Sequence, residues 1–215
     1  VLFDGRPLSD VSQREQAERI GFVQQSPENQ IVTDKVWHEL AFGLESLGYD
    51  TPTIRRRVAE MAGFFGMESW FHRETASLSG GQKQLLNLAA VLTLQPDVLI
   101  LDEPTAGLDP KERVRFRNLI SDFAKDKIVI LSTHIVSDVS YIADTILMMK
   151  DGTFLLQEPM ATITDSINGK VWELLVSDRE AAEYSKRFSV VNLHHENGNV
   201  RLRMIHDTSP AADAI

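Results

Sequence analysis

Several absences limit what this 215-residue chain does. It contains no cysteine, which excludes disulfide bonds and thiol-based zinc or redox sites. No apolar run approaches the roughly 18 residues that a membrane-spanning helix needs. Positive charge is in deficit: the formal net charge of −9 argues against non-specific nucleic-acid binding. With 43% hydrophobic and 25% charged residues, the composition is that of a soluble, packed protein.

Apolar runs of strand length alternate with helical patterns along most of the chain. We expect strands at Val1–Phe3, Ile20–Val23, Val98–Leu101, Ile128–Leu131 and Thr145–Met149. Helices are expected through Leu94 from about residue 80, from Pro110 to Ala124, and from Ile135 to Tyr141. The runs Val98–Leu101 and Ile128–Leu131 have the length and character of buried strands. This alternation predicts an α/β fold with a largely parallel sheet.

A helical segment interrupts that alternation. From Asp34 to about Met67 the apolar residues recur at helical spacing, with Gly48 ending one helix and Thr51-Pro52 opening the next. Together with the helix that runs to Leu94, this predicts a helical subdomain over about residues 34–95. The subdomain is inserted between strand-containing segments.

The composition changes near Gly152. Beyond it, Val171–Val176 and Val200–Ile205 are typical of strands, and Asn197-Gly198 is a hairpin signal. We therefore predict one α/β domain over residues 1–152. A small C-terminal accessory region, β-containing and ending in a flexible tail, would occupy residues 153–215.

Two motifs point to phosphate chemistry. Val98–Leu101 delivers two adjacent carboxylates, Asp102 and Glu103, at the end of an apolar strand, where Mg²⁺ and an activated water would use them. Ser79, Gly80, Gly81 and Gln82 open an apolar-periodic helix, so backbone N–H groups and the helix dipole would attract an anion. Each motif alone also has a plain explanation: a strand running into acidic surface residues, and a Ser-capped helix after a glycine turn.

Together these motifs resemble a known family. The sequence LSGGQ at 78–82, followed by VLILDEPTAGLD at 98–109, resembles the signature motif, catalytic strand and D-loop of ATP-binding-cassette (ABC) ATPases. Gln25, after an apolar strand, resembles the family's Q-loop glutamine. His134, in Ser132-Thr133-His134, resembles its switch histidine. These co-ordered matches cover nearly all of residues 1–152.

The resemblance implies a P-loop NTPase-like fold and a role for each of these residues. Two cassettes would face each other head to tail with ATP between them. Glu103 would be the general base, and Asp102 would hold Mg²⁺ through its water shell. Gln25 would take part in catalysis by sensing the metal and the attacking water, and His134 would contact the γ-phosphate and the attacking water. Ser79, Gly80, Gly81 and Gln82 would contact the nucleotide held by the opposite subunit, and Asp109 would couple the two sites.

The family's phosphate-binding loop is missing. No G-x-x-x-x-G-K-[ST] sequence (Walker A) occurs, and Gly80-Gly81-Gln82-Lys83 and Gly169-Lys170 lack its spacing. The chain also has no signal peptide and starts at Val1 without an initiator Met. We therefore expect the phosphate-binding loop to lie upstream of Val1, and the chain alone to bind ATP poorly.

The subfamily is mixed. Residues 1–104 resemble the ATPases of energy-coupling-factor importers of vitamins and metal ions, whereas residues from about 111 onward resemble exporter-type ATPases. Two genes joined near residues 101–110, or a genuine subfamily with mixed features, would both give this pattern.

Partners and location follow from the resemblance. We expect a second ABC ATPase subunit, transmembrane permease subunits gripped by the helical segment, and no nucleic acid. The protein would lie peripherally on the cytoplasmic face of the cell membrane. The alternatives are an exporter rather than an importer, a soluble ABC ATPase outside transport, and a non-enzymatic remnant.

Overall fold

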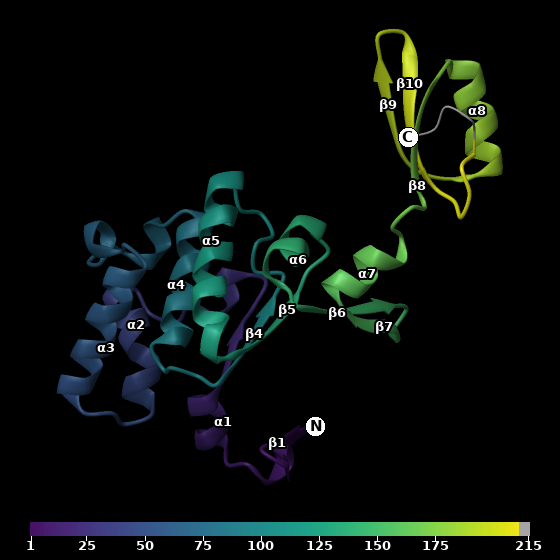
Figure 1. Ribbon diagram of the computed structural model, residues 1–215. Helices are drawn as coiled ribbons and strands as arrows, with labels where there is room; N and C mark the ends of the chain where they lie inside the picture. The colour runs from purple at the N-terminus through teal and green to yellow at the C-terminus, as the bar shows by residue number, and fades with distance from the viewer. Residues whose placement is uncertain (211–215) are drawn as a thin grey trace. The chain divides into compact units, whose positions relative to one another are not determined.

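The computed structural model describes residues 1–210, which fall into two compact units, Val1–Ile142 and a second that begins at Ala143. The first unit is built on a parallel sheet of β3 (Ile20–Val23), β4 (Val98–Asp102) and β5 (Ile128–Ser132), in the order β3-β4-β5 (Figure 1). Because the strands are parallel, their carboxyl ends meet at one edge. The register pairs Val23 with Leu101, and Asp102 with Ser132.

Only one face of this sheet is buried. Val23, Leu99 and Leu101 pack in one core with residues of α4 (Gly80–Leu92) and α5 (Pro110–Phe123). On the other face Ile128 and Ile130 are 62% and 53% exposed. The expectation that Ile128–Leu131 is a buried strand is therefore wrong, because the other two side chains, Val129 and Leu131, are only half-buried. Among the described residues helices cover one face of the sheet, and alternate side chains point to opposite faces.

The helical segment has the expected form. α2 (Val36–Ser46) and α3 (Thr51–Phe64) lie beside each other and next to α4 (Figure 1). α3 begins with Asp50, whose side chain accepts a hydrogen bond from the Thr53 N–H, and with a proline in its first turn. α2 and α3 contribute apolar side chains to the same core as the sheet.

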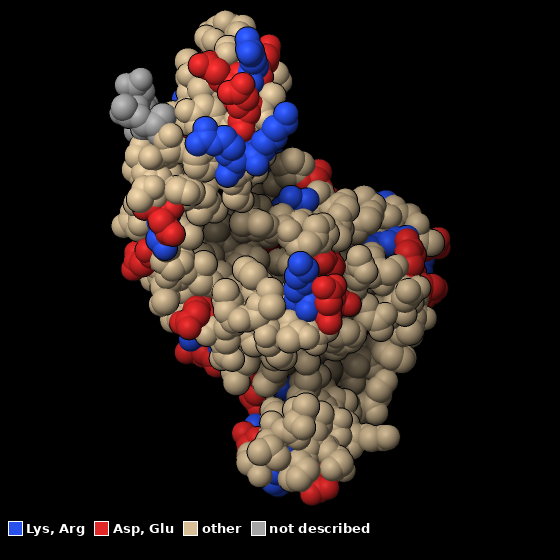
Figure 2. Space-filling model, turned by 90° about the vertical axis from the view of Figure 1, so that its right-hand side faces the viewer, with Lys and Arg blue, Asp and Glu red and all other residues tan. Residues whose placement is uncertain are grey.

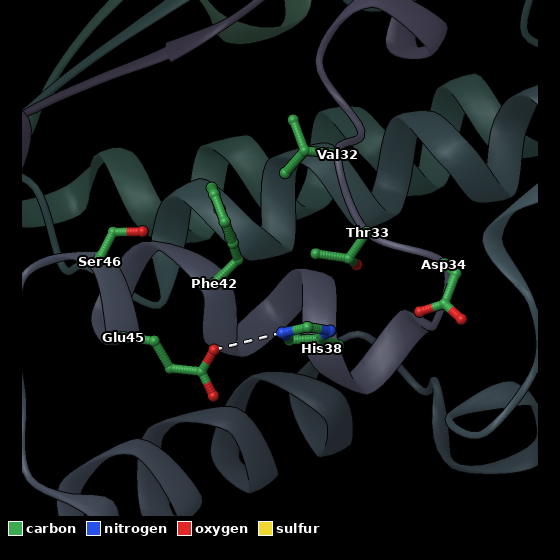
Figure 3. A pocket seen from close by; sticks show the side chains of 7 residues that line it. All are labelled: Val32, Thr33, Asp34, His38, Phe42, Glu45 and Ser46. Atoms are coloured by element: carbon green, nitrogen blue, oxygen red, sulfur yellow. Dashed lines mark ion pairs between the residues drawn. The ribbon is translucent and has the colours of Figure 1, made fainter.

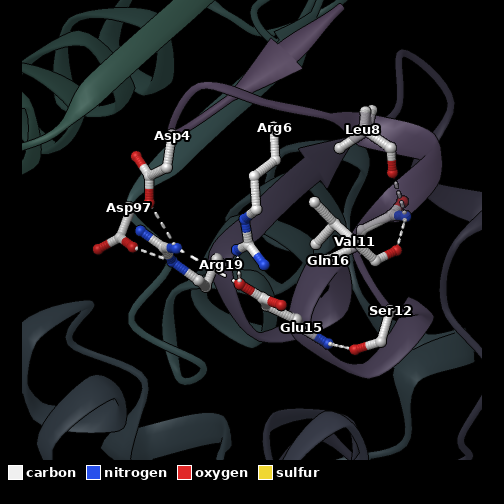
Figure 4. Close-up of polar contacts among 9 residues, drawn as sticks. All are labelled: Asp4, Arg6, Leu8, Val11, Ser12, Glu15, Gln16, Arg19 and Asp97. Carbon is white, nitrogen blue, oxygen red and sulfur yellow. Dashed lines mark hydrogen bonds and ion pairs between the residues drawn. The ribbon is translucent and has the colours of Figure 1, made fainter.

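At the N-terminus the strand expected at Val1–Phe3 is present, and it belongs to a hairpin that is followed by a helix that was not predicted. β1 (Leu2–Phe3) pairs with β2 (Arg6–Pro7), and α1 (Gln13–Arg19) leads into β3. Arg19 joins these parts, with its guanidinium 2.8 Å from Asp4 and 2.7 Å from Asp97 (Figure 4). The hydrogen bond from Arg19, with a second from Lys127, lowers the pKa of Asp97. Short 3-10 helices lie at Leu8–Asp10, Pro27–Asn29, Glu68–Trp70, Thr75–Ser77 and Ala124–Asp126.

The second unit begins earlier than the boundary predicted at residue 152. After α6 (Val136–Ile142), β6 (Thr145–Lys150) pairs antiparallel with β7 (Thr153–Pro159) and does not join the β3-β4-β5 sheet. A helix, α7 (Met160–Ser166), follows. The pairing of β6 with β7 places β6 in the second unit, whose division from the first falls between Ile142 and Ala143.

The rest of this unit is a three-stranded antiparallel sheet with one helix. β8 (Val171–Val176), β9 (Ser189–Glu196) and β10 (Asn199–Ile205) have the order β8-β10-β9, and α8 (Asp178–Arg187) packs against them through Ala181. The predicted hairpin at Asn197-Gly198 is confirmed, since it joins β9 to β10. The predicted flexible tail lies largely outside the described residues.

The surface charge is mixed. Figure 2 shows Lys and Arg side chains beside Asp and Glu side chains, in small groups over the face that it presents. No helix within residues 1–210 is long and apolar enough to cross a membrane.

Candidate functional site

Asp102 and Ser132 meet at the carboxyl edge of the parallel sheet. They are register partners at the ends of β4 and β5, and the Ser132 hydroxyl donates to Asp102 Oδ1 over 2.6 Å. Ser132 also accepts the Glu103 N–H, at 3.0 Å on its backbone oxygen and 3.2 Å on its hydroxyl. The carboxylate of Asp102 is thus oriented by a hydroxyl that the sequence analysis did not single out.

Glu103 and His134 form a pair directly beside it. His134 Nδ1 lies 2.9 Å and 2.8 Å from the two carboxylate oxygens of Glu103. The Glu103 backbone has φ of 45°, in the left-handed region that non-glycine residues rarely adopt. The Glu103 side chain is 21% exposed and the His134 side chain 75% exposed, so both are open to a substrate from solvent.

Gln25 belongs to the same edge by topology. It follows β3, whose last residue, Val23, pairs with Leu101 of β4. Gln25 is exposed, and within residues 1–210 its side chain makes no hydrogen bond. The loop that carries it is held by its backbone, because the side chains of Gln84 and Asn87 donate to the carbonyls of Gln24 (3.4 Å) and Pro27 (3.3 Å).

Ser79 and Gln82 close the first turn of α4 as a capping box. Gln82 N–H donates to Ser79 Oγ over 3.2 Å, and Ser79 N–H donates to Gln82 Oε1 over 3.0 Å. Ser79 is therefore a helix cap, as expected for a Ser-capped helix after a glycine turn. Ser79 and Gly80 are exposed at the start of the helix, and the capping box leaves the Ser79 hydroxyl proton free to donate.

Asp109 caps α5 in the same way and lies near the signature motif. Asp109 Oδ1 accepts the Glu112 N–H over 2.8 Å, and Glu112 Oε2 accepts the Asp109 N–H over 3.4 Å. The Glu112 carboxylate also packs against Gly81. The predicted residues thus gather into two groups: Asp102, Glu103, His134 and Gln25 at the sheet edge, and the signature motif with Asp109 joined through Glu112.

The oxygen donors at the sheet edge suit a magnesium ion that keeps most of its own shell. Asp102 supplies an exposed carboxylate and Gln25 an amide oxygen, both hard ligands of the kind that Mg²⁺ prefers. No group of three or more His, Cys, Asp or Glu side chains able to hold a metal ion occurs in residues 1–210. Mg²⁺ in phosphate-handling sites is commonly bound by one or two carboxylates plus substrate phosphates, which this donor set fits.

Comparisons with known proteins decide the family. Residues 1–106 match the ABC transporter family model. CbiO1 of Clostridium perfringens, part of the ABC transporter complex cbiONQ, is 31% identical with a TM-score of 0.69, covering 86% of this chain and 71% of that one. The chain belongs to the ABC transporter ATP-binding family.

Two curated proteins are also similar to this chain in sequence. A putative ABC transporter ATP-binding protein of Bacillus thuringiensis is 39% identical over 176 residues, covering 81% of this chain and 31% of that protein. The energy-coupling factor transporter ATP-binding protein EcfA1 of Methanospirillum hungatei is 37% identical over 168 residues, covering 76% and 60%. The chain therefore spans about a third of the length of the first curated relatives that it matches.

The cassette fold is likewise shown by structure. A dimeric ATP-binding cassette in a post-hydrolysis state bound to ADP and Pi has a TM-score of 0.65 at 23% identity, over 74% of this chain and 72% of that one. The ABC ATPase fold with its helical subdomain agrees with the predicted fold class. The match to EcfA1 covers 76% of the chain, so it passes through residues 101–110.

Proposed function

We propose that this chain is the catalytic part of an ATP-hydrolysing subunit in a membrane transporter of the energy-coupling-factor type. The observation that carries the proposal is the pairing of Glu103 with His134, 2.8 Å apart, beside Asp102 at the carboxyl edge of a parallel sheet. Ligands of open α/β sheets bind at that edge. The relative named as an energy-coupling factor transporter ATP-binding protein supports a transporter of this type, which the sequence resemblance describes as an importer.

In this function Glu103 acts as general base. Its carboxylate would accept a proton from the water that attacks the γ-phosphate, while His134 holds the carboxylate in place and donates toward the phosphate. Asp102 and Gln25 would hold Mg²⁺, which supplies charge neutralisation on the phosphates. Because phosphoryl transfer depends mainly on positioning and electrostatics, the loss of any one of these groups lowers turnover without unfolding the chain.

The signature motif serves the nucleotide of a second cassette. Exposed Ser79 and Gly80 at the N-terminus of α4 present a hydroxyl and backbone N–H groups, which favour a phosphate oxygen. Gln82 and Asp109 stabilise this surface through the two capping boxes, and Gly81 packs against the Glu112 carboxylate of the second one. Two copies arranged head to tail would each complete the site of the other, with Asp109 coupling the two.

A pocket beside α2 supports docking of the transporter's membrane subunits. It has a volume of about 570 Å³ and is lined by Val32, Thr33, Asp34, His38, Phe42, Glu45 and Ser46 (Figure 3). His38 Nε2 lies 3.3 Å from Glu45 Oε2 along one side. Phe42 is 43% exposed, so apolar surface is open beside the charged groups. Such a hollow suits a short amphipathic helix that inserts an apolar side chain.

The test is Glu103→Gln in the complete protein with its phosphate-binding loop. The amide keeps the shape of the side chain but accepts no proton, so steady-state ATP hydrolysis should be abolished while ATP binding persists. Glu60→Gln, on the exposed side of α3 where Glu60 pairs only with Arg56, is the matched control and should hydrolyse ATP normally. Normal turnover in Glu103→Gln would overturn the assignment.

A further inference from the structure

The carboxylate of Asp138 is fully buried, and none of the roles proposed above uses it. Thr105, itself 1% exposed, donates its hydroxyl proton to Asp138 Oδ2. The Arg117 guanidinium, from α5, lies 3.5 Å from Asp138 Oδ1. Burying a carboxylate is unfavourable unless it is paired and hydrogen-bonded, so the three side chains depend on one another.

These contacts lie next to the catalytic pair along both chain segments. Thr105 follows Glu103 on the loop after β4, and Asp138 follows His134 in the first turn of α6. The hydrogen bond between Thr105 and Asp138 therefore joins the two loops at positions that follow Glu103 and His134 in the sequence. At positions that precede the pair, the hydrogen bond between Asp102 and Ser132 joins the strands from which the same loops emerge.

Within residues 1–210 the side chains of Glu103 and His134 have no hydrogen bonds except the one to each other, so their contact depends on such ties. The His134 side chain is 75% exposed, and Glu103 has the unfavourable φ of 45° noted above. A residue in the left-handed region persists only when its surroundings enforce it. With both ends of each loop fixed, the Glu103 carboxylate and the His134 imidazole are kept within hydrogen-bond distance.

Arg117 connects this clamp to α5. Its guanidinium also donates to the Ser137 carbonyl over 3.1 Å and lies 4.9 Å from the centre of the Tyr141 ring. Tyr141 in turn donates to Asn118 Oδ1 over 2.9 Å. α6 is thereby fixed against α5, the helix that Asp109 caps, so the loop of His134 has a rigid support.

We propose that Thr105 and Asp138 are positioning residues that set the contact between Glu103 and His134. The proposal rests on the proposed function for its catalytic consequence, but not for its geometry. Thr105→Val removes the hydroxyl and keeps the shape of the side chain, so it releases one end of the clamp. Thr105→Ser restores the hydroxyl. Thr93→Val is the matched control, because Thr93 is equally buried and, within residues 1–210, its hydroxyl donates to the Ala90 carbonyl alone.

The first measurement is made on this chain alone, by NMR of its imidazole nitrogens. His134→Gln assigns the His134 signal, and Glu103→Gln shows where that signal moves when the carboxylate is absent. We expect Thr105→Val to shift the signal toward its position in Glu103→Gln, Thr105→Ser to restore it, and Thr93→Val to leave it unchanged. If Thr105→Val fails to fold, Thr105→Ala takes its place with the same expectation. An unshifted His134 signal in the folded variant overturns the proposal.

The second measurement is the rate of ATP hydrolysis by the complete protein. A misplaced catalytic pair should lower kcat by about 10- to 100-fold while KM for ATP stays within about twofold. A merely structural role would give Thr93→Val the same loss, which would overturn the proposal. If the unmodified complete protein hydrolyses no ATP, the proposed function fails, and the NMR measurement still decides whether Thr105 positions His134.

Discussion

Gly81 of the signature helix packs directly against the carboxylate of Glu112, so closely that a methyl group on Gly81 would overlap it. Glu112 is the residue whose carboxylate accepts the Asp109 N–H in the cap of α5. The absence of a side chain at Gly81 therefore allows the signature motif and the D-loop of one subunit to share a contact. Gly80, its neighbour, has open space around the same position.

This contact predicts different results for the same substitution at neighbouring glycines. Gly81→Ala should push the Glu112 carboxylate off the Asp109 N–H and lower the free energy of unfolding by about 0.5–1 kcal/mol, the net contribution of one hydrogen bond, while the Asp109 side chain still caps α5. Gly80→Ala should be neutral or stabilising, because alanine is favoured over glycine in a helix. Urea unfolding of the two variants measures the difference.

A double-mutant cycle separates the contact from other effects of the added methyl group. In a Glu112→Ala background nothing remains for the methyl group to displace, so Gly81→Ala should then be no worse than Gly80→Ala. A full penalty for Gly81→Ala in that background would show that Glu112 is not its cause.

The fold was largely predictable from the sequence, because strong local signals coincided with it. The strands β3, β4 and β5 are short apolar runs, α3 and α5 have a proline in their first turn, and Gly48 lies just beyond the end of α2. Three α-helices were missed, α1, α7 and α8. Of these, α1 and α8 begin with Ser-x-x-Glu, Ser12 to Glu15 and Ser177 to Glu180, and each serine accepts the N–H of its glutamate. A search for that capping pattern would have found them.

The site was predictable only in part. Parallel strands bring their carboxyl ends together, so Asp102, Glu103 and His134 could be placed at one edge from their order alone. The partnership of Asp102 with Ser132 depends on strand register, which sequence periodicity does not give. The packing of Glu112 on Gly81 depends on the distance between α4 and α5. The burial of Asp138 depends on three separate segments, which carry Asp138, Thr105 and Arg117.

Ser132→Ala should weaken the response to magnesium. The variant loses the hydroxyl that donates to Asp102 over 2.6 Å, while the Glu103 N–H keeps its bond to the Ser132 backbone oxygen. Groups that orient a metal ligand typically contribute 10- to 100-fold to metal affinity, and about tenfold is expected where the ion keeps its water shell. A Mg²⁺ titration of ATP hydrolysis by the complete protein measures this.

Ser140→Ala is the control for that titration. Among the described residues the Ser140 hydroxyl donates to the Ser137 carbonyl alone, within α6, and forms no hydrogen bond with Asp102. Its half-saturating Mg²⁺ concentration should match that of the unmodified protein. Equal Mg²⁺ dependence in Ser132→Ala and Ser140→Ala would contradict a role for Ser132 at the metal.

The backbone at Glu103 should reverse the usual order of alanine and glycine. Both Glu103→Ala and Glu103→Gly remove the carboxylate, so they differ mainly in how well they tolerate φ of 45°. Glycine avoids the penalty of about 1 kcal/mol that a β-carbon meets there, so Glu103→Gly should unfold at the higher urea concentration. At Glu60, inside α3, alanine should instead be the more stable by about 0.5–1 kcal/mol. The same order at both positions would show that Glu103 is not held in this conformation.

Asp97 should make the stability of the chain depend on pH in the acid range. Its hydrogen bonds with Arg19 and Lys127 lower its pKa in the folded state, so its ionised form stabilises the fold. That contribution is fully present above the ordinary aspartate pKa of about 3.9 and is lost as the pH falls from there through the lower folded value. Asp97→Asn should therefore be less stable than the unmodified chain at pH 7, and the difference should shrink toward pH 2. Because the Asp97 side chain is 45% exposed, solvent screening limits the difference at pH 7 to about 1 kcal/mol.

Urea unfolding of the unmodified chain and of Asp97→Asn between pH 7 and pH 2 measures this difference in stability. A difference that stays constant over this range would mean that the carboxylate charge contributes nothing and that the amide disturbs only the local packing between α1 and β4.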